Sequence, residues 1–351
     1  MTATGVRSAF RDGIRRVNGA PIVLFGMFVV TLLVAVPLTI ALRSMLEAHL
    51  GQSLEAEAAA VGTNYGWWRE FSAQASGLGT TFLPSVVGFG AVLDNLNAFL
   101  DGERLPPTLA GVLAGWMVIW SFLVGGVLDR YARGRPTRAH GFFAACGTHF
   151  WRFLRLGIAA AAVYAVLFQW VRPWLFDDGY ERLIRNMTVE RSAFTLRLVL
   201  YAVFGTLLML VNVVIDYARI RIVVEDRRSA LGALIAGARF VAREKGSVLL
   251  YLLNALAFLV LVLVYALAAP GAPRAGFSMW VVFAVGELYL LGRHYLKLLF
   301  YASETAFFQG ALAHASYTAA PPVVWPDSPA AEAVVNADSA EGSSAALGTG
   351  R

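Results

Sequence analysis

Cysteine, lysine and charge are all scarce in this chain of 351 residues. The single cysteine, Cys146, excludes an internal disulfide and a cysteine-rich metal site. Charged residues make up only 15% of the chain, against about 25% in a typical soluble domain. The basic residues are nearly all arginine, since Lys245 and Lys297 are the only lysines. Together with abundant alanine, this bias indicates a bacterial source of high GC content.

Complete catalytic motifs are missing as well. The sequence contains no HExxH, GxSxG, paired CxxC or phosphate-binding loop. We therefore expect no metal and no cofactor, and an intramembrane enzyme is the least favoured class of function. The net charge of +6 does not indicate a nucleic-acid partner, because charge in a membrane protein first follows its topology.

Long apolar runs dominate what is present. Hydrophobic residues make up 58% of the chain, and the mean hydropathy is +0.62. Runs of about 20 apolar residues can cross a bilayer as helices, whereas a β-barrel needs alternating apolar and polar positions. We predict an all-α, polytopic integral membrane protein with about six transmembrane helices. The predicted spans are 21–42, 108–128, 156–171, 198–215, 247–269 and 277–299.

The distribution of arginine predicts the orientation of these spans. Lys and Arg are roughly twice as frequent in the alternate segments that include the N-terminus, which the positive-inside rule places in the cytoplasm. Both termini are then cytoplasmic, and the protein lies in a bacterial inner membrane. The predicted regions are an amphipathic N-terminus (1–20), the first span (21–42), an extracytoplasmic loop domain (43–107), a helical bundle with cytoplasmic amphipathic helices (108–318) and a disordered tail (319–351).

Residues 7–17 have the pattern of a short surface helix. Phe10, Ile14 and Val17 recur at helical spacing, and arginines occupy other positions. This pattern is typical of a helix that lies on an anionic membrane face.

Two segments repeat one arrangement. GGVLDRYARGRPTRAHGFFAACGTHFWRFLRLGI (125–158) and NVVIDYARIRIVVEDRRSALGALIAGARFVAREKGSVLL (212–250) each contain the end of a span, an Asp, an Ala-Arg pair, an Arg-rich turn, an amphipathic stretch and another span. We predict two repeated helical hairpins, with amphipathic helices at 141–153 and 230–243. Such repeats are common in transporters, and they also arise in structural bundles by duplication.

The arginines of the two repeats follow Asp129 and Asp216, where hydrocarbon gives way to water. Their long side chains can reach lipid phosphates from that depth. The alternatives are an Asp–Arg pair that fixes the turn, and a site for a soluble partner. The predicted contacts with anionic headgroups are Arg130, Arg133, Arg135, Arg219, Arg221, Arg227 and Arg228.

The segment VIDYARIRIVVEDRRSALGALIAGARFV (214–241) and its first copy also carry a family resemblance. They resemble uncharacterised bacterial membrane proteins akin to the membrane domain found beside glycerophosphodiester phosphodiesterases. The resemblance covers roughly 108–312 and implies a helical membrane domain. The catalytic phosphodiesterase domain has no counterpart in the sequence, so the resemblance does not imply that enzyme activity.

The predicted outer loop contains a tryptophan pair, Trp67 and Trp68, ahead of the apolar stretch 82–100. Pro84 and several polar residues argue against a full span, so that stretch is expected to form a re-entrant or interfacial helix. The pair and the apolar stretch together predict a mouth for a lipid or peptide. The alternative is an aromatic belt at the membrane interface.

The last predicted span contains Glu287 and His294, seven residues apart and therefore on one helical face. An acidic residue within a membrane is costly, so it indicates function by default. The two residues are a candidate ligand or proton site: either they form a proton-coupled pair, or Glu287 accepts from Asn212 or Asn254 on neighbouring spans. The alternative is that Glu287 is paired and structural.

Small residues suggest where helices approach each other. Gly111 and Gly115 form a GxxxG motif, and Gly125 and Gly126 follow it; all of them permit close packing. Cys146 is expected to be a small buried residue rather than a nucleophile.

These observations favour a non-enzymatic scaffold or accessory subunit of an envelope or transport complex. The alternative is a carrier or lipid-handling protein that uses a polar site around Glu287. The expected partners are membrane lipids, above all anionic headgroups, and another membrane protein or a second copy of the chain.

Overall fold

A computed structural model describes residues 3–61, 64–83, 89–101, 107–134, 137–269 and 276–319. The described residues form helices and no strand, which confirms the predicted all-α fold. The chain divides into two compact units, Met1–Phe308 and Gln309–Arg351, so the division falls ten residues before the predicted start of the tail. The predicted tail, 319–351, lies outside the described residues except for Ala319. All that follows concerns the first unit.

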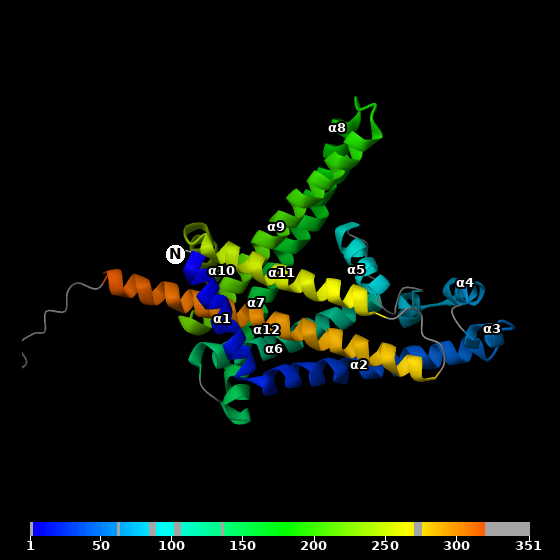
Figure 1. Cartoon of the computed structure of the whole chain (residues 1–351), viewed down its shortest axis with the longest axis horizontal. Helices are drawn as coiled ribbons and strands as arrows, with labels where there is room; N and C mark the ends of the chain where they lie inside the picture. Colours follow the sequence, from blue (N-terminus) through cyan, green and yellow to red (C-terminus); the bar gives the residue numbers. More distant parts are fainter. Residues whose placement is uncertain are drawn as a thin grey trace, which may run out of the picture. The chain divides into compact units, whose positions relative to one another are not determined.

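Twelve α-helices and three short helical turns make up the described residues (Figure 1). The α-helices are α1 (Ala3–Asn18), α2 (Pro21–Leu50), α3 (Ala56–Val61), α4 (Tyr65–Gln74), α5 (Phe89–Asp101), α6 (Pro107–Arg133), α7 (Ala139–Val166), α8 (Tyr180–Ile184), α9 (Glu190–Val224), α10 (Ala230–Arg243), α11 (Gly246–Ala268) and α12 (Phe277–Ala319). The turns are the 3-10 helix η1 (Gly77–Thr81) and the π-helical η2 (Leu167–Val171) and η3 (Trp174–Gly179).

Five of the described helices are long and apolar enough to cross a membrane, and they contain the first five predicted spans. They are Pro21–Leu50, Leu109–Arg133, Ala139–Ile184, Glu190–Val224 and Gly246–Ala268. The chain is therefore a multi-pass membrane protein. The sixth predicted span lies in α12, where Glu287, Arg293 and Lys297 interrupt the apolar run. That crossing stays a prediction.

Helix starts follow the local sequence. Pro21 occupies the first turn of α2, where its missing N–H is not needed. Ser229 caps α10 by accepting from the Gly232 N–H at 3.1 Å, and Asn64 caps α4 by accepting from the Trp67 N–H at 3.0 Å. The short turn before α10 lets that helix fold back along α9.

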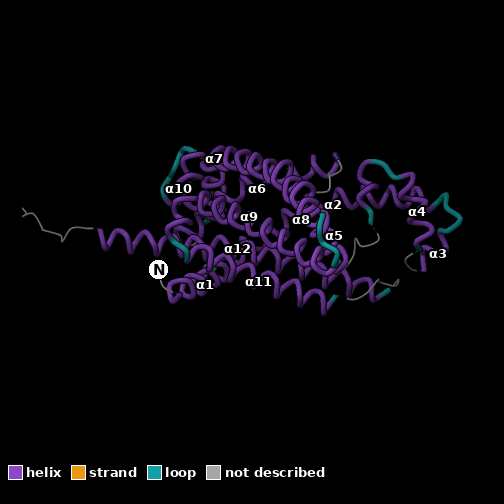
Figure 2. Tube along the Cα trace, turned by 90° about the horizontal axis from the view of Figure 1, so that it is seen from above, coloured by secondary structure: helices purple, strands orange, loops and turns teal. Residues whose placement is uncertain are grey.

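The first predicted hairpin, of the second and third spans, is α6 with α7. In the second repeat α9 packs along α10, and only little against α11, which contains the fifth span (Figure 2). The predicted amphipathic helix at 230–243 is α10. The predicted separate helix at 141–153 is wrong, because α7 runs unbroken from Ala139 to Val166. The two copies differ at the break itself: α10 ends before Glu244 and Lys245, whereas the aligned residues Leu154 and Arg155 continue as helix within α7.

Glycines make the close approaches within each hairpin. A Cβ on Gly126 would lie 2.6 Å from Cys146 Sγ on α7, and one on Gly237 would lie 2.9 Å from the Val214 carbonyl oxygen on α9. Packing at Gly126 is as predicted, and Cys146 is buried. Within the described residues of one chain, a Cβ on Gly111 or Gly115 would meet nothing within 4 Å, so close packing at the GxxxG motif stays a prediction.

Helix α1 packs against the bundle with its apolar face. Val6, Ala9 and Val17 are buried, and a Cβ on Gly13 would lie 2.6 Å from Ser303 Cβ on α12. Its Arg16 donates to the Tyr131 carbonyl of α6 at 2.8 Å. The predicted membrane-facing apolar side is thus used for protein contact, which joins α1 to α6 and α12. We call this end of the bundle the α1 end.

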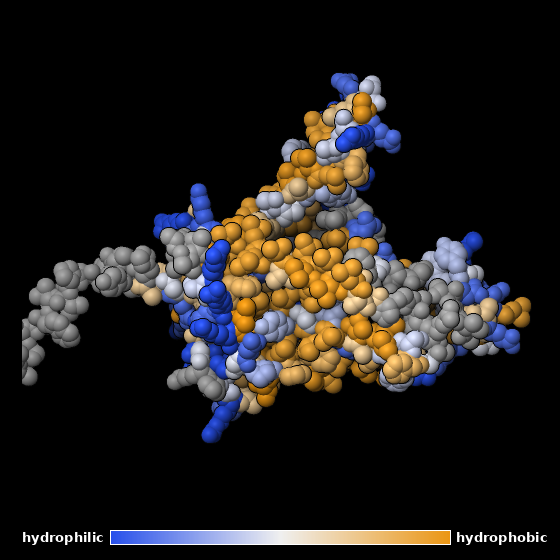
Figure 3. All heavy atoms as spheres, viewed as in Figure 1, coloured by the Kyte–Doolittle hydropathy of each residue, from blue (hydrophilic) through white to orange (hydrophobic). Residues whose placement is uncertain are grey.

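The sides of the bundle are apolar. Figure 3 shows hydrophobic residues over α11 and the adjoining helices, and polar residues gathered beside α1. Large apolar side chains are exposed on α2, α9, α11 and α12, as expected where helices contact lipid. Examples are Leu33, Leu198, Leu259, Leu263 and Phe283.

Candidate functional site

Helices α2, α6, α7, α9, α11 and α12 surround a cavity of about 680 Å³. That volume lies within the range of about 300–1,000 Å³ that is usual for small-molecule sites. All of its lining residues belong to the first unit. A cavity of this size inside a membrane bundle is the strongest candidate for a site.

An ion pair lies in the wall of the cavity. Arg219 donates through Nη1 to Asp216 Oδ1 at 2.6 Å and to the Tyr301 hydroxyl at 3.1 Å. Both charged residues lie on α9, three apart, so one helical face presents them together. Asp216 and Arg219 face the cavity rather than forming the predicted turn, which begins after α9 ends at Val224.

Two further cations line the cavity from α12. Lys297 Nζ lies 3.7 Å from the centre of the Trp120 ring, a cation–π contact, and Trp120 in turn stacks on Tyr301. Arg293 lies one helical turn before Lys297, and both side chains are exposed. Within the described residues neither has an acidic partner in a salt bridge. The cavity wall thus contains three cations and one carboxylate.

The cavity changes character along its length. On three helices, two lining residues lie seven positions apart, a rise of about 10 Å. In each pair the residue nearer the α1 end carries a polar group or a charge, and the other carries neither. The pairs, nearer residue first, are Trp120 and Leu113 on α6, Tyr251 and Phe258 on α11, and Lys297 and Leu290 on α12. Leu113 and Phe258 are 46% and 38% exposed, so the apolar part reaches the side of the bundle. The cavity is amphipathic.

His294 is fixed by α2. Its Nε2 lies 3.0 Å from Thr31 Oγ1, and the Thr31 hydroxyl donates to the Met27 carbonyl at 2.9 Å. Which of the two atoms donates depends on the tautomer of His294. His294 therefore joins α12 to α2 at the cavity wall, and no contact with Glu287 is recorded among the described residues.

The predicted polar group around Glu287 is only partly brought together. Asn212 and His294 both line the cavity, and Asn212 accepts from the Tyr164 hydroxyl at 2.7 Å. Asn254 donates to Ser303 Oγ at 2.9 Å instead. Glu287 Oε2 is buried and has no hydrogen-bond partner among the described residues. Neither Asn254 nor Glu287 is a lining residue of the cavity.

The tryptophan pair of the outer loop is engaged in local structure. Trp67 is 7% exposed, donates through Nε1 to His49 Nδ1 at 3.1 Å, and stacks on Phe71. Trp68 donates to the Phe82 carbonyl at 3.2 Å. Both indole N–H groups are thus satisfied within this segment. Of the predicted apolar stretch, α5 is described and 84–88 is not, so its position in a membrane stays a prediction.

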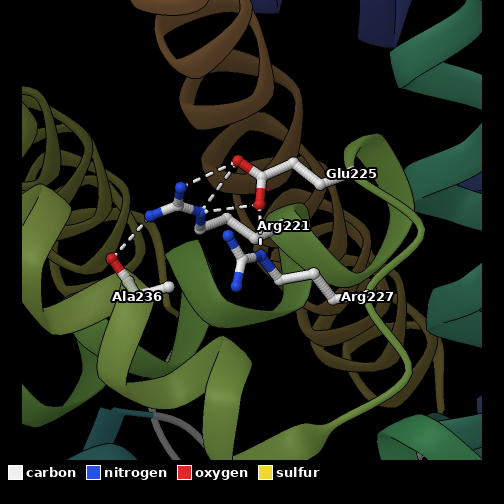
Figure 4. A network of polar contacts seen from close by, with 4 residues as sticks. All are labelled: Arg221, Glu225, Arg227 and Ala236. Carbon is white, nitrogen blue, oxygen red and sulfur yellow. Dashed lines mark hydrogen bonds and ion pairs between the residues drawn. The ribbon is translucent and has the colours of Figure 1, made fainter.

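The second arginine-rich turn is held together by internal contacts (Figure 4). Arg221 donates to both oxygens of Glu225 and, at 2.6 Å, to the Ala236 carbonyl of α10; Arg227 also donates to Glu225. Burial alone would raise the pKa of Glu225, but the hydrogen bonds from the two arginines lower it below the ordinary value. The network fastens α10 to the end of α9.

The remaining predicted lipid contacts differ in their surroundings. Arg133 pairs with Asp129 at 2.8 Å, Arg130 donates to the Gly19 carbonyl at 3.1 Å, and Arg228 is exposed. Arg135 lies outside the described residues. Arg219 and Arg221 are turned toward protein partners, so exposed positions such as Arg228 are the better candidates for headgroup contact.

Sequence reasoning missed the central residues of the cavity. Trp120, Arg293 and Lys297 all belong to it, and the sequence did not single out any of them as site residues. A usable signal existed, because Arg293 and Lys297 are four apart and share a helical face within an apolar run. Glu304 was also missed: it is fully buried, neither carboxylate oxygen has a described partner, and burial raises its pKa well above the ordinary value.

Comparison with known proteins adds no relative: no family model, no curated protein and no solved structure matches this chain.

Proposed function

We propose that this protein handles lipids: it takes an amphiphilic molecule from the bilayer into the cavity and holds the polar end of that molecule near the α1 end. The observation that carries the proposal is an amphipathic cavity of about 680 Å³ among six helices, five of which are long and apolar enough to cross a membrane. Its charged end and its apolar end match the two parts of a membrane lipid. The resemblance to membrane domains beside glycerophosphodiester phosphodiesterases is compatible with this role.

Filling the cavity tests the proposal. Gly157 lines the cavity, and a Cβ there would meet only Ser121 Oγ, at 3.8 Å. Gly157→Leu should therefore fold normally and reduce the lipid retained per protein by about tenfold, because its side chain occupies the ligand's space. Native mass spectrometry of gently extracted protein measures the retained lipid.

Gly147→Leu is the matched control on the same helix. Gly147 is exposed, does not line the cavity, and has nothing within 4 Å of a Cβ. It should retain lipid like the unmodified protein. Equal lipid retention in both variants and the original chain would contradict the proposal. Flux of fluorescent lipid in proteoliposomes then separates a carrier from a lipid-binding protein.

The proposed orientation places the α1 end in the cytoplasm. Because Cys146 is buried, it will not react with a thiol reagent from either side, so it cannot report topology. An introduced cysteine can: Arg228→Cys replaces an exposed residue in the turn before α10. We expect no labelling of this variant by an impermeant maleimide in intact cells, and labelling after lysis. Labelling in intact cells would reverse the orientation.

A scaffold remains the second candidate, and one feature supports it. The hairpin of α7 and α9 has its own small core around Phe176 and Phe204, and it exposes Trp170, Trp174 and Phe194. Such aromatic residues suit contact with a membrane-protein partner or a second copy. A partner that copurifies with Gly157→Leu as well as with the original chain would favour the scaffold over lipid handling.

A further inference from the structure

We infer that the charged end of the cavity binds the phosphate group of an anionic ligand, held between Arg293 and Lys297 of α12. This inference rests on the proposed function, because it names the chemical class of ligand for the same cavity.

Arg293 and Lys297 carry charge that the described protein does not neutralise. They are four residues apart, so their side chains are neighbours on one face of α12 and repel each other. Neither has a salt-bridge partner among the described residues, although they belong to a predicted span, where an unpaired charge is costly. A bound anion between them would turn this repulsion into two attractions.

Asp216, the carboxylate in the cavity wall, does not neutralise Arg293 and Lys297. Asp216 is already paired with Arg219 at 2.6 Å, and Arg219 is further held by Tyr301. With that pair internally balanced, the two α12 cations remain as the net charge of the cavity. A zwitterionic or cationic head would gain less from this wall than a phosphate would.

The surroundings fix where the phosphate would lie. The Lys297 ammonium rests over the Trp120 ring at 3.7 Å, which holds it at the wall, and the N–H groups that do not face the ring can donate to a ligand. The guanidinium of Arg293 supplies paired donors of the geometry that phosphate prefers. Beyond them, Leu290 and Phe258 begin the apolar part, where an acyl chain attached to the phosphate would lie.

The lysines allow a direct test on the full-length protein in a neutral detergent. Lys245 is exposed and outside the cavity, so it is an internal control for Lys297. The rate of acetylation of each lysine by an amine-reactive ester is measured by mass spectrometry. The added probes are dihexanoyl phosphatidic acid, dihexanoyl phosphatidylcholine with the same chains, and inorganic phosphate.

We expect phosphatidic acid to slow acetylation of Lys297 by about tenfold at nine-tenths occupancy, without affecting Lys245. Protection by inorganic phosphate alone would keep the anion site but remove the lipid-handling role. Equal protection by phosphatidylcholine would overturn the anion inference and keep that role. Absence of protection by every probe, or a Lys297 that never reacts, would overturn both.

A substitution tests whether Arg293 itself contacts the phosphate of the ligand that protects Lys297. Arg293→Gln removes one phosphate contact and should raise the phosphatidic acid concentration needed for half-protection of Lys297 by about tenfold. Arg155→Gln is the matched control, because Arg155 is exposed on α7 and does not line the cavity. If the two variants need the same concentration, Arg293 does not hold the ligand.

Discussion

Replacing Gly237 by valine should destabilise the protein severely, by about 3 kcal/mol, whereas the same change at Gly115 should have almost no effect. At Gly237 the first added carbon would lie 2.9 Å from the Val214 carbonyl oxygen and 3.1 Å from the Ala218 amide nitrogen. These atoms belong to the backbone of α9 and cannot move aside without distorting that helix. The new side chain would therefore force α10 away from α9.

Gly115 is the matched control for this effect. It also lies within a helix, but it is exposed and a Cβ there would meet nothing within 4 Å. Valine at Gly115 adds apolar surface toward lipid and changes helix propensity by only a few tenths of a kcal/mol. The comparison thus separates loss of packing space from any general cost of replacing glycine.

The single cysteine provides the measurement. Cys146 is 0% exposed, so a thiol-reactive fluorogenic dye reacts only when the α6–α7 hairpin opens on heating. We expect the apparent midpoint of Gly237→Val to fall by several degrees or the variant to fail to fold, and that of Gly115→Val to stay unchanged. Similar midpoints for the two variants would mean that α9 and α10 do not pack as closely as the structure has them.

The same two glycines show what the sequence could and could not predict. Helices and their approximate positions were predictable, because an apolar run of about 20 residues has few other outcomes in a membrane protein. The face that each helix turns to its neighbour was not, because a GxxxG spacing fits lipid contact and helix contact equally. Only the packing shows that, among the described residues, Gly126 and Gly237 meet another helix of this chain while Gly111 and Gly115 do not.

The sequence predicted that a polar site exists among the helices, but not which residues form it. An ionisable residue in an apolar run indicated a polar site, and Asn212 and His294 do line the cavity. The prediction chose Glu287 as the centre because it is the acidic residue within the last predicted span and shares a helical face with His294. The cavity instead depends on α9 facing α12, which brings Arg219 to Tyr301, 82 positions later, and sequence spacing cannot reveal such a contact.

The repeat predicted the structure of residues 125–250 only in part. Its duplication predicted two hairpins, and the sequence identified α10 correctly. In the first copy the amphipathic part continues into the span as one helix, α7, whereas the second copy has a break between α10 and α11. Similarity between copies therefore predicted the order of elements better than it predicted where helices end.

The second large effect is expected at the ion pair of the cavity wall. Arg219→Gln should destabilise the protein by about 3 kcal/mol, because it leaves the Asp216 carboxylate without a partner in a low-dielectric site. The side chains of Arg219 and Asp216 are only 24% and 13% exposed, so water compensates little. Asp216→Asn should cost less, because the Tyr301 hydroxyl still accepts from Arg219.

The double variant Asp216→Asn/Arg219→Gln identifies the origin of the loss. With both charges removed no uncompensated ion remains, so it should recover most of the stability lost in Arg219→Gln, with a coupling energy of about 2 kcal/mol. The exposed pair Arg43–Glu47 on α2 is the control: its atoms are 2.7 Å apart, but its side chains are 75% and 60% exposed. Arg43→Gln should cost less than about 0.5 kcal/mol.

The Cys146 reaction again measures the midpoints, now for four variants at one pH and ionic strength. If Arg219→Gln proves no more harmful than Arg43→Gln, the cavity wall is as well solvated as the protein surface. A double variant as unstable as Arg219→Gln would mean that Arg219 stabilises α12 through Tyr301 and not through its charge. We expect the double variant to be more stable than Arg219→Gln, and this order follows only if Asp216 and Arg219 neutralise each other. If they do, Arg293 and Lys297 supply the net charge of the cavity.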